Sequence, residues 1–326
     1  MSDTPKLIVI TGPTATGKTA LGVQVAKLLD GEVIGADSMQ IYRGMAIGTA
    51  APTPEETEGV PHHMIGFADP GESYSVSRYV EDATKIADDI IARGKVPIVV
   101  GGTGLYIDSL IDGREFGASQ ADPGMRAMLE NQYDTIGGDA MLAMLHSFDP
   151  DRAEKLHPGD KRRIVRAIEV YLLSGRTITD HDQETQARPK RFPALKYALD
   201  FVDREVLYQR IGLRVDRMEV LGLFDEVQRL LDAGVDMEST AMQAIGYKEP
   251  ALALQGALTR QEALDRVKQS SRQYAKRQLT WLRRDHDVQW ITWQQTPDIP
   301  AAARKIAGDW ARAHQNFPAE TENDWI

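Results

Sequence analysis

The chain has 326 residues and a net charge of −10, with 42% hydrophobic and 26% charged residues. These proportions are ordinary for a globular protein of one large or two moderate domains. The absence of cysteine excludes disulfides, thiolate catalysis and cysteine-ligated zinc. We see no signal peptide and no apolar run near the ~18 residues of a membrane span, so we expect a cytoplasmic protein. The negative charge argues against a protein that coats nucleic acid nonspecifically, but it does not exclude local basic patches.

An apolar run near the N-terminus leads into a glycine-containing loop, Gly12-Pro13-Thr14-Ala15-Thr16-Gly17-Lys18-Thr19. The loop fits the pattern G-x-x-x-x-G-K-[ST], in which a strand, a tight turn and a helix bind phosphate. Backbone N–H groups and the positive end of the helix dipole converge on the anion. Lys18 would neutralise a terminal phosphate, and the Thr19 hydroxyl would bind Mg²⁺. The sequence therefore predicts that the protein binds a di- or triphosphate, without indicating which one.

Strands and helices alternate over the first hundred residues. We expect strands at Leu7–Thr11, Glu32–Ala36 and Val96–Val100, and helices at Lys18–Leu29 and Val76–Ala92. The alternation predicts an α/β fold with a mostly parallel sheet and helices on both faces. Ligands gather at the carboxyl ends of strands in such sheets. The P-loop, Asp37 and Gly101–Gly104 are therefore expected in one crevice.

The pattern changes near Gly117. Helical patterns follow at Met125–Gln132, Ala140–Leu145 and Arg162–Leu173, and we expect the polar run Asp180–Arg191 to be flexible. We predict an inserted all-helical domain at 118–192. The P-loop α/β core would comprise 1–117 and 193–314, with a flexible tail at 315–326. In its second part we expect a strand at Leu195–Phe201, helices at Arg204–Leu231 (with a break near Gly222) and Gln261–Leu282, and a strand at Val288–Trp293.

One carboxylate, Asp37, is expected at a strand end opposite the P-loop. This place suits a base near the transferring group, although an aspartate there can equally cap a turn. The strand before Gly101 lacks the terminal aspartate with which phosphate-hydrolysing P-loop enzymes hold Mg²⁺, so we do not expect ATP hydrolysis. We interpret His62-His63 as part of a turn rather than a metal site, because no further ligand is suitably spaced.

Further motifs follow the P-loop in order. They are Asp37-Ser38-Met39-Gln40-Ile41-Tyr42-Arg43-Gly44-Met45, Ile47-Gly48-Thr49, Pro61-His62-His63, Gly101-Gly102-Thr103-Gly104-Leu105-Tyr106, Arg162-Arg163-Ile164-Val165-Arg166-Ala167-Ile168-Glu169 and Ile245-Gly246-Tyr247-Lys248-Glu249. This collinear set resembles the tRNA dimethylallyltransferases, also called tRNA isopentenyltransferases (the IPP transferase family). The likeness covers about residue 6 to 295 and is far more specific than the P-loop alone. Small departures occur at Gly124, where a bulkier or acidic residue is expected, and at Gly104, a variable position.

The resemblance implies transfer of a dimethylallyl group from dimethylallyl diphosphate to N6 of an adenine. The acceptor would be the adenine next to the anticodon (position 37) of tRNAs reading codons that begin with U. The P-loop, from Gly12 to Thr19, would bind the diphosphate, with Mg²⁺ on Thr19. Asp37 would accept the N6 proton, and Lys18, Thr19 and Arg214 would complete the catalytic set. The implied partners are the tRNA anticodon stem-loop and dimethylallyl diphosphate, and we expect a monomer.

Two basic clusters predict the RNA-binding surface. Residues 266–284 hold seven Lys or Arg and no acid, and Arg162, Arg163 and Arg166 form a second cluster. Such patches position RNA phosphates, and the target adenine must flip out of its stack to reach Asp37. Together with the resemblance, the clusters imply these tRNA-binding residues: Asp37, Ser38, Met39, Gln40, Thr103, Arg126, Arg162, Arg163, Arg166, Gln243, Gly246, Tyr247, Lys248, Lys276, Arg277 and Arg283. We expect burial rather than RNA stacking for Trp281, and core or sheet packing for Trp290, Trp293 and Trp310.

Two other functions stay open at this point. A P-loop small-molecule kinase could use Asp37 to activate a substrate hydroxyl, but the sequence offers no lid-like arginine cluster beside an adenine pocket. An adenylate isopentenyltransferase would use the same donor with a mononucleotide acceptor. That acceptor would leave both basic clusters without a use.

Overall fold

The computed structural model describes residues 4–114 and 122–315. Close contacts divide the chain into a core unit, Met1–Ile111 with Phe192–Ile326, and a helical unit, Asp112–Arg191. The domain boundary expected at 117 falls outside the described residues, as does the expected tail beyond residue 315.

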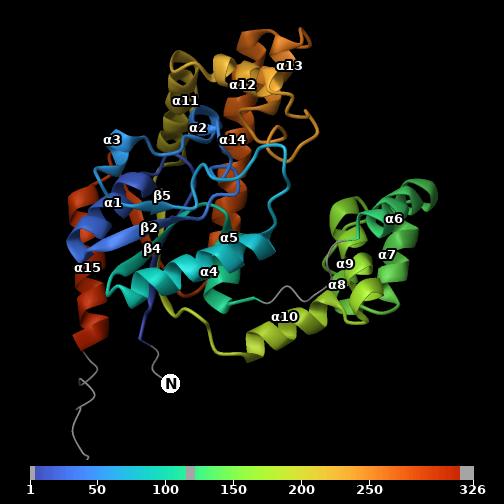
Figure 1. Cartoon of the computed structure of the whole chain (residues 1–326), viewed down its shortest axis with the longest axis horizontal. Coiled ribbons are helices and arrows are strands. Elements are labelled where there is room, and N and C mark those ends of the chain that lie inside the picture. The colour runs from blue at the N-terminus through green and yellow to red at the C-terminus, as the bar shows by residue number, and fades with distance from the viewer. Residues whose placement is uncertain (1–3, 115–121, 316–326) are drawn as a thin grey trace, which may run out of the picture. The chain divides into compact units, whose positions relative to one another are not determined.

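A parallel β-sheet forms the middle of the core unit (Figure 1). Among the described residues its strand order is β3-β2-β4-β1-β5-β6. The strands are β1 (Leu7–Thr11), β2 (Gly31–Gly35), β3 (His62–His63), β4 (Val96–Gly101), β5 (Ala194–Phe201) and β6 (Val288–Trp293). Ile10 of β1 pairs with Val100 on one side and with Tyr197 on the other. The P-loop after β1 therefore lies near the centre of the carboxyl edge, and the predicted parallel α/β fold is confirmed.

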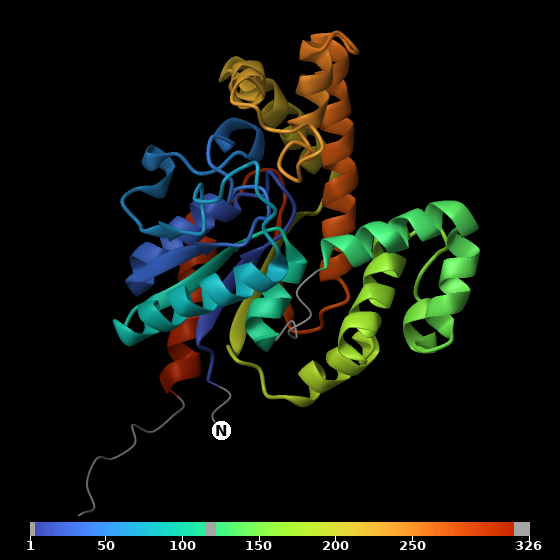
Figure 2. The same ribbon diagram turned by 45° about the vertical axis from the view of Figure 1, so that its right-hand side comes forward.

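Helices cover both faces of this sheet. Helices α1 and α15 pack against each other on one face, whereas α4 lies against β2 and β4 on the other (Figure 2). The predicted break near Gly222 is confirmed, because this glycine has a φ of +96° between α11 and α12. The helices of the core unit are α1 (Lys18–Leu29), α2 (Ala46–Thr49), α3 (Pro54–Thr57), α4 (Val76–Ala92), α5 (Gly104–Asp112, ending at the unit boundary), α11 (Arg204–Val220), α12 (Leu223–Asp232), α13 (Lys248–Leu254), α14 (Arg260–Leu282) and α15 (Ile299–Gln315).

The helical unit has a hydrophobic core of its own. Its helices are α6 (Pro123–Ile136), α7 (Gly138–His146), α8 (Pro150–Ala153), α9 (Lys161–Ser174) and α10 (Ile178–Ala187). Leu129, Met141 and Ile164 are buried together at its centre. The flexible exit predicted from Asp180 onward is wrong as far as Ala187. A capping box of Thr177 with Asp180 starts α10, and Ile178 packs on the core.

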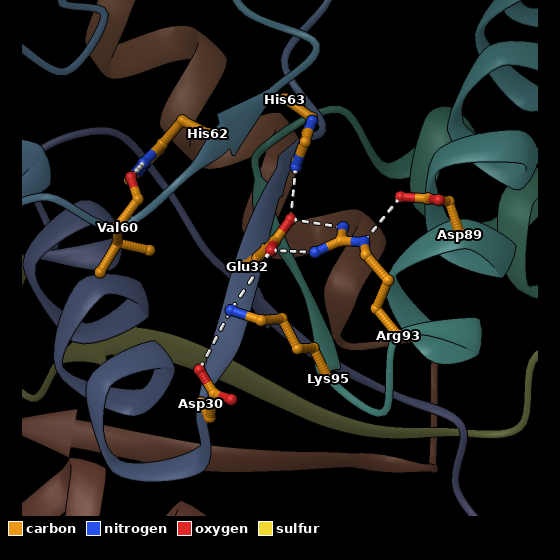
Figure 3. Close-up of polar contacts among 8 residues, drawn as sticks. All are labelled: Asp30, Glu32, Val60, His62, His63, Asp89, Arg93 and Lys95. Atoms are coloured by element: carbon orange, nitrogen blue, oxygen red, sulfur yellow. Dashed lines mark hydrogen bonds and ion pairs between the residues drawn. The ribbon is translucent and has the colours of Figure 1, made fainter.

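Two local expectations in the core unit are also wrong. The His62-His63 pair forms the edge strand β3 instead of a turn, and His63 Nε2 lies 2.8 Å from the buried Glu32 carboxylate (Figure 3). Trp290 is 37% exposed, because its side chain alternates outward on the edge strand β6. Trp293, three residues later, is buried as expected.

Candidate active site

Three segments meet at the carboxyl edge of the sheet, as the sequence predicted. The N–H of Ala36 donates to the carbonyl of Val100 at 2.8 Å, and the N–H of Thr103 donates to the carbonyl of Ala36 at 3.0 Å. A Cβ at Gly101 would lie 2.1 Å from that Ala36 oxygen, so only glycine allows this approach. The loop before Asp37 and the loop after β4 are therefore directly joined.

The P-loop has the conformation that its glycines permit. Gly12 has a φ of +136°, and a Cβ there would lie 2.6 Å from the Leu199 carbonyl oxygen of β5. Gly17, with a φ of +92°, precedes the first residue of α1. Left-handed backbone of this kind favours glycine. The loop thus leaves its N–H groups around the amino end of α1, where an anion binds well.

Side chains from distant segments hold three consecutive P-loop residues. Arg214 Nη1 donates to Thr14 Oγ1 at 2.7 Å, Arg210 Nε to the Ala15 carbonyl at 2.9 Å, and Trp293 Nε1 to the Thr16 carbonyl at 3.0 Å. Arg210 and Arg214 lie one turn apart on α11 and so share a face. Sequence reasoning identified Arg214 but missed Arg210, although the i, i+4 spacing was a usable signal. Nothing local in the sequence pointed to the Trp293 contact.

The site is electropositive around Lys18. Its Nζ donates to the carbonyl of Pro13 at 2.6 Å. Burial and then the charge of Arg214 lower the pKa of Lys18 to about 7, against the opposing effect of Asp37. Burial also lowers the pKa of Arg214, which Asp37 and Glu56 partly offset. Two crowded cations of this kind would be stabilised by a bound diphosphate.

Asp37 caps a turn, as one of its two interpretations predicted. Its Oδ1 accepts hydrogen bonds from the N–H groups of Met39 and Gln40 at 2.9 and 3.3 Å, so it does cap a turn. Within the described residues, Oδ2 accepts no hydrogen bond and is free for a substrate proton. The neighbouring Ser38 N–H donates to Thr103 Oγ1 at 3.0 Å. The carboxylate is thus oriented by backbone and available on one oxygen.

A second carboxylate lies near a strand end, contrary to our expectation that Asp37 would be the sole one. Asp200 lies one residue before the end of β5, next to β1, and is 6% exposed. Its Oδ2 lies 4.0 Å from Arg204 and 3.9 Å from Arg283. Because Asp200 lies within a mostly apolar strand, the sequence pattern did not identify it as a candidate site residue. Arg283, an expected tRNA contact, is therefore also close to a buried acid.

Helix α14 places three side chains against the loop after β4. Gln278 Nε2 donates to the Gly102 carbonyl at 2.9 Å. The ring of Trp281 packs on Gly104, where a Cβ would approach within 2.2 Å. Trp281 is half-buried in this contact, which explains the glycine at 104. Burial and the nearby Asp37 raise the pKa of Tyr274 to about 12, so its hydroxyl stays protonated. The sequence did not point to Gln278 or Tyr274 as neighbours of the site.

A buried glutamate organises the segment behind Asp37. Glu226 of α12 is 3% exposed, and its carboxylate accepts the N–H groups of Ala46, Ile47 and Gly48 at 3.0 Å each. The hydroxyl of Tyr247 donates to the same carboxylate at 2.6 Å. An acid at a helix amino end is favourable, so α12 holds α2 in place. Sequence reasoning missed Glu226.

The hydrogen-bonded contacts around α2 continue to Gln40 and Arg214, two of the expected site residues. The carbonyl of Ala50, directly after α2, accepts Gln40 Nε2 at 3.2 Å and Arg214 Nη2 at 3.4 Å. Tyr247 is fully buried, with its ring so close to Gly48 that a Cβ there would lie 2.4 Å away. Any contact of Tyr247 with RNA must therefore come from its backbone.

The other expected RNA-binding residues lie mostly on exposed elements. Lys248 Nζ donates to Gln243 Oε1 at 3.1 Å, which joins two of them. Lys276 and Arg277 are exposed on α14. A shallow surface cavity of about 260 Å³ is lined by Lys276, Arg277, Thr280, Trp281 and Arg284. In the helical unit, Arg162 and Arg163 are exposed on α9, while Arg126 and Arg166 share the carboxylate of Glu169.

The described residues contain no cluster of three or more His, Asp or Glu side chains that could hold a metal on its own. The half-buried hydroxyl of Thr19 makes no hydrogen bond within them and is available as a ligand. One hard oxygen ligand beside a phosphate site suits Mg²⁺, which keeps several waters and binds substrate phosphates. In the same part of the chain, no helix has the length and apolar character needed to cross a membrane.

Comparison with known families identifies the family of the chain. Residues 40–285 match the family described as "IPP transferase", and residues 5–65 match "Isopentenyl transferase". The chain is 48% identical to a "tRNA dimethylallyltransferase" of Carboxydothermus hydrogenoformans over 88% of this chain and 91% of that protein. It is 44% identical to the protein of that name in Pelotomaculum thermopropionicum, over 92% and 95% of the two chains.

Solved structures show the same likeness. A tRNA isopentenylpyrophosphate transferase from Bacillus halodurans superposes with a TM-score of 0.71 at 41% identity, covering 95% of this chain and 98% of that one. A eukaryotic dimethylallyltransferase acting on tRNA gives a TM-score of 0.80 at 31% identity, covering 97% and 81%. The chain therefore belongs to the IPP transferase family, the transferase family of the tRNA dimethylallyltransferases.

Proposed function

We propose that this protein transfers a dimethylallyl group from dimethylallyl diphosphate to N6 of the adenine at position 37 of tRNA, next to the anticodon. The acceptors would be tRNAs that read codons beginning with U, and the products N6-(dimethylallyl)adenosine and diphosphate. One observation carries the proposal. In a chain of this family, a P-loop that accepts hydrogen bonds from Arg210 and Arg214 lies at the same edge of the sheet as Asp37. One oxygen of the Asp37 carboxylate is free within the described residues.

The donor's diphosphate would lie on the P-loop, with its allylic carbon toward Asp37. As the bond from that carbon to oxygen breaks, negative charge grows on the leaving diphosphate. The N–H groups of residues 12–19, the Lys18 ammonium and Arg214 would stabilise that charge. The donor's charge would also favour protonation of Lys18, whose pKa is lowered to about 7 by burial and Arg214.

The acceptor nitrogen needs a base, because the lone pair of adenine N6 is delocalised into the ring. Asp37 Oδ2 would accept the N6 proton as the new bond to carbon forms. Oδ1 stays fixed by Met39 and Gln40, so the carboxylate need not reorient. The base must leave its stack to reach this oxygen. Ser38, Met39, Gln40 and Thr103 border Asp37 and would contact the flipped adenine.

Mg²⁺ would be held by the Thr19 hydroxyl together with phosphate oxygens, and would supply further neutralisation of the diphosphate. The tRNA phosphates would be positioned by Lys276, Arg277 and Arg283 of the core unit and by Arg126, Arg162, Arg163 and Arg166 of the helical unit. Gln243, Gly246, Tyr247 and Lys248 complete the proposed RNA contacts. One copy of the chain carries the proposed residues, so we propose a monomer, acting in the cytoplasm where tRNA is found.

The test is to incubate the protein with unmodified tRNA, dimethylallyl diphosphate and Mg²⁺, and to analyse the digested nucleosides by mass spectrometry. We expect an adenosine heavier by one dimethylallyl group, located by sequencing at position 37. Omitting tRNA and adding AMP tests for an adenylate isopentenyltransferase. Replacing the donor with ATP and a panel of small alcohols tests for a kinase. Product only in the AMP or ATP reactions would refute the proposal.

A further inference from the structure

A buried carboxylate joins two arginines in the helical unit. Glu169 of α9 is 0% exposed, and its Oε2 accepts Arg126 Nη2 of α6 at 2.6 Å and Arg166 Nη1 of its own helix at 2.8 Å. The arginine side chains keep 41% and 37% of their surface exposed. Each is therefore anchored at one nitrogen and keeps surface for a further partner.

The carboxylate is ionised in this setting. Burial would raise the pKa of Glu169, but the hydrogen bonds and charges of Arg126 and Arg166 outweigh burial and leave the pKa lowered. Two guanidiniums and one carboxylate leave a net positive charge. Arg162, one turn before Arg166 and exposed, adds a further positive charge on α9. The cluster thus attracts anions despite the acid at its centre.

Anchoring matters because a free arginine samples many rotamers and loses that freedom when it binds. A guanidinium has five N–H donors, and the bond to Glu169 occupies one on each arginine. The remaining donors suit phosphate oxygens, which arginine binds in fixed planar geometry. A pre-positioned pair therefore binds phosphates at a lower entropic cost than two independent side chains.

We propose that Glu169 is a positioning residue for tRNA binding, holding Arg126 and Arg166 from two helices as one phosphate-binding pair. The ligand is the backbone of the anticodon stem-loop, so the inference rests on the proposed function. Glu169 itself touches no substrate. Its effect is transmitted through the two arginines.

Removing the carboxylate distinguishes two physical explanations, because they predict opposite changes in tRNA affinity. If Glu169 acted only as a charge near RNA, Glu169→Gln would remove a repulsion and tighten binding. If it positions the arginines, the same change releases them and weakens binding. A matched control is Glu154→Gln, which removes the same charge from an exposed side chain that makes no ion pair within the described residues.

The experiment is filter binding of an unmodified anticodon stem-loop across a salt series, with thermal melting to confirm folding. For Glu169→Gln we expect about tenfold weaker binding. The slope of log K against log[salt] should fall by about 0.7–0.9 for each RNA phosphate that the released arginines no longer neutralise. In turnover assays KM for tRNA should rise by the same factor, while kcat and KM for dimethylallyl diphosphate stay unchanged. Glu154→Gln should bind as tightly as wild type or more so.

Combining Glu169→Gln with substitutions of both arginines tests whether the glutamate acts through them or only supports the fold. In an Arg126→Ala/Arg166→Ala background, Glu169→Gln should cause no further loss of tRNA binding, because it acts through those arginines. It should also raise the melting temperature there, since it removes a buried carboxylate that no longer has its arginine partners. If Glu169→Gln melts below the assay temperature, Glu169→Asp keeps the charge, shortens the side chain and should also weaken binding.

A folded Glu169→Gln or Glu169→Asp protein that binds the stem-loop as tightly as wild type would overturn the inference. So would a further loss of binding in the arginine-free background. Failure of the proposed function is distinguishable, because in that case the wild-type protein itself would not modify or bind tRNA.

Discussion

The ion cluster around Glu32 offers a stability test that leaves the chemistry of the site untouched. Glu32 lies at the amino end of β2, at the opposite end of that strand from Asp37. Its carboxylate, 5% exposed, accepts Arg93 Nη1 and Nη2 at 2.5 and 2.8 Å and lies 2.8 Å from His63 Nε2 (Figure 3). Lys95 lies 3.6 Å away. The cluster links β2, β3 and the chain leading into β4.

The contribution of this cluster to the free energy of unfolding follows from the pKa of Glu32. The Arg93 hydrogen bonds, opposed by burial and supported by His63, lower it from 4.5 to about 2. At about 1.4 kcal/mol per pKa unit, this shift corresponds to about 3 kcal/mol of stability at pH 7. Because the folded pKa is depressed, the contribution is present above about pH 5 and is lost as the pH falls toward 2. Arg93 is partly exposed, so solvent screening brings the expected value to about 2–3 kcal/mol.

We therefore expect Glu32→Gln to lower the free energy of unfolding by about 2–3 kcal/mol at pH 7, and by about half as much at pH 3. All five tryptophans fall after residue 192 in the sequence, so their fluorescence during urea unfolding reports on the core unit. The control is Glu81→Gln, which breaks an exposed ion pair with Lys85 and should change little. A Glu32→Gln loss that is absent at pH 7, or equal at both pH values, would refute this reasoning.

The remaining predictions concern the site itself. Asp37→Asn keeps the oxygen that caps the turn but loses the base, so single-turnover transfer should slow by ~10²–10⁴-fold with little change in tRNA affinity; a rate within a few-fold of wild type would exclude Asp37 as the base. Arg210→Ala should raise KM for dimethylallyl diphosphate less than Arg214→Ala does, because Arg210 contacts the loop backbone whereas Arg214 also interacts with the charge of Asp37. An unchanged KM in both variants would contradict a role in diphosphate binding. Glu226→Gln places an amide against the N–H groups of α2, and we expect roughly tenfold lower kcat/KM from displacement of Arg214 and Gln40. Wild-type kinetics in that variant would show that the position of α2 does not matter for turnover.

Sequence reasoning succeeded where the physical cause is local. The glycines, Lys18 and Thr19 have the P-loop arrangement because a strand, a tight turn and a helix follow one another within a few residues. The alternation of strands and helices placed Asp37 and Gly101 at the same edge of a parallel sheet. The break at Gly222 follows from the left-handed backbone that glycine tolerates.

Local pattern was misleading where a side chain or segment depends on its neighbours in space. Asp180–Ala187 is polar enough to resemble a flexible linker, yet it is helical, because Thr177 and Asp180 form a capping box and Ile178 packs on the core. The His62-His63 pair is a strand because β2 offers it an edge and Glu32 a partner. Asp200 is hidden in an apolar strand, and its arginine partners come from α11 and the end of α14.

The sequence by itself therefore determined the family, the sheet and the places of the P-loop and Asp37. Only the tertiary structure decided what holds them in position. Arg214 reaches Thr14 across 200 residues, Glu226 reaches Ala46 across 180, and Trp293 reaches Thr16 across 277. Such contacts depend on which faces of separate helices and strands pack together. No local spacing along the chain encodes that packing.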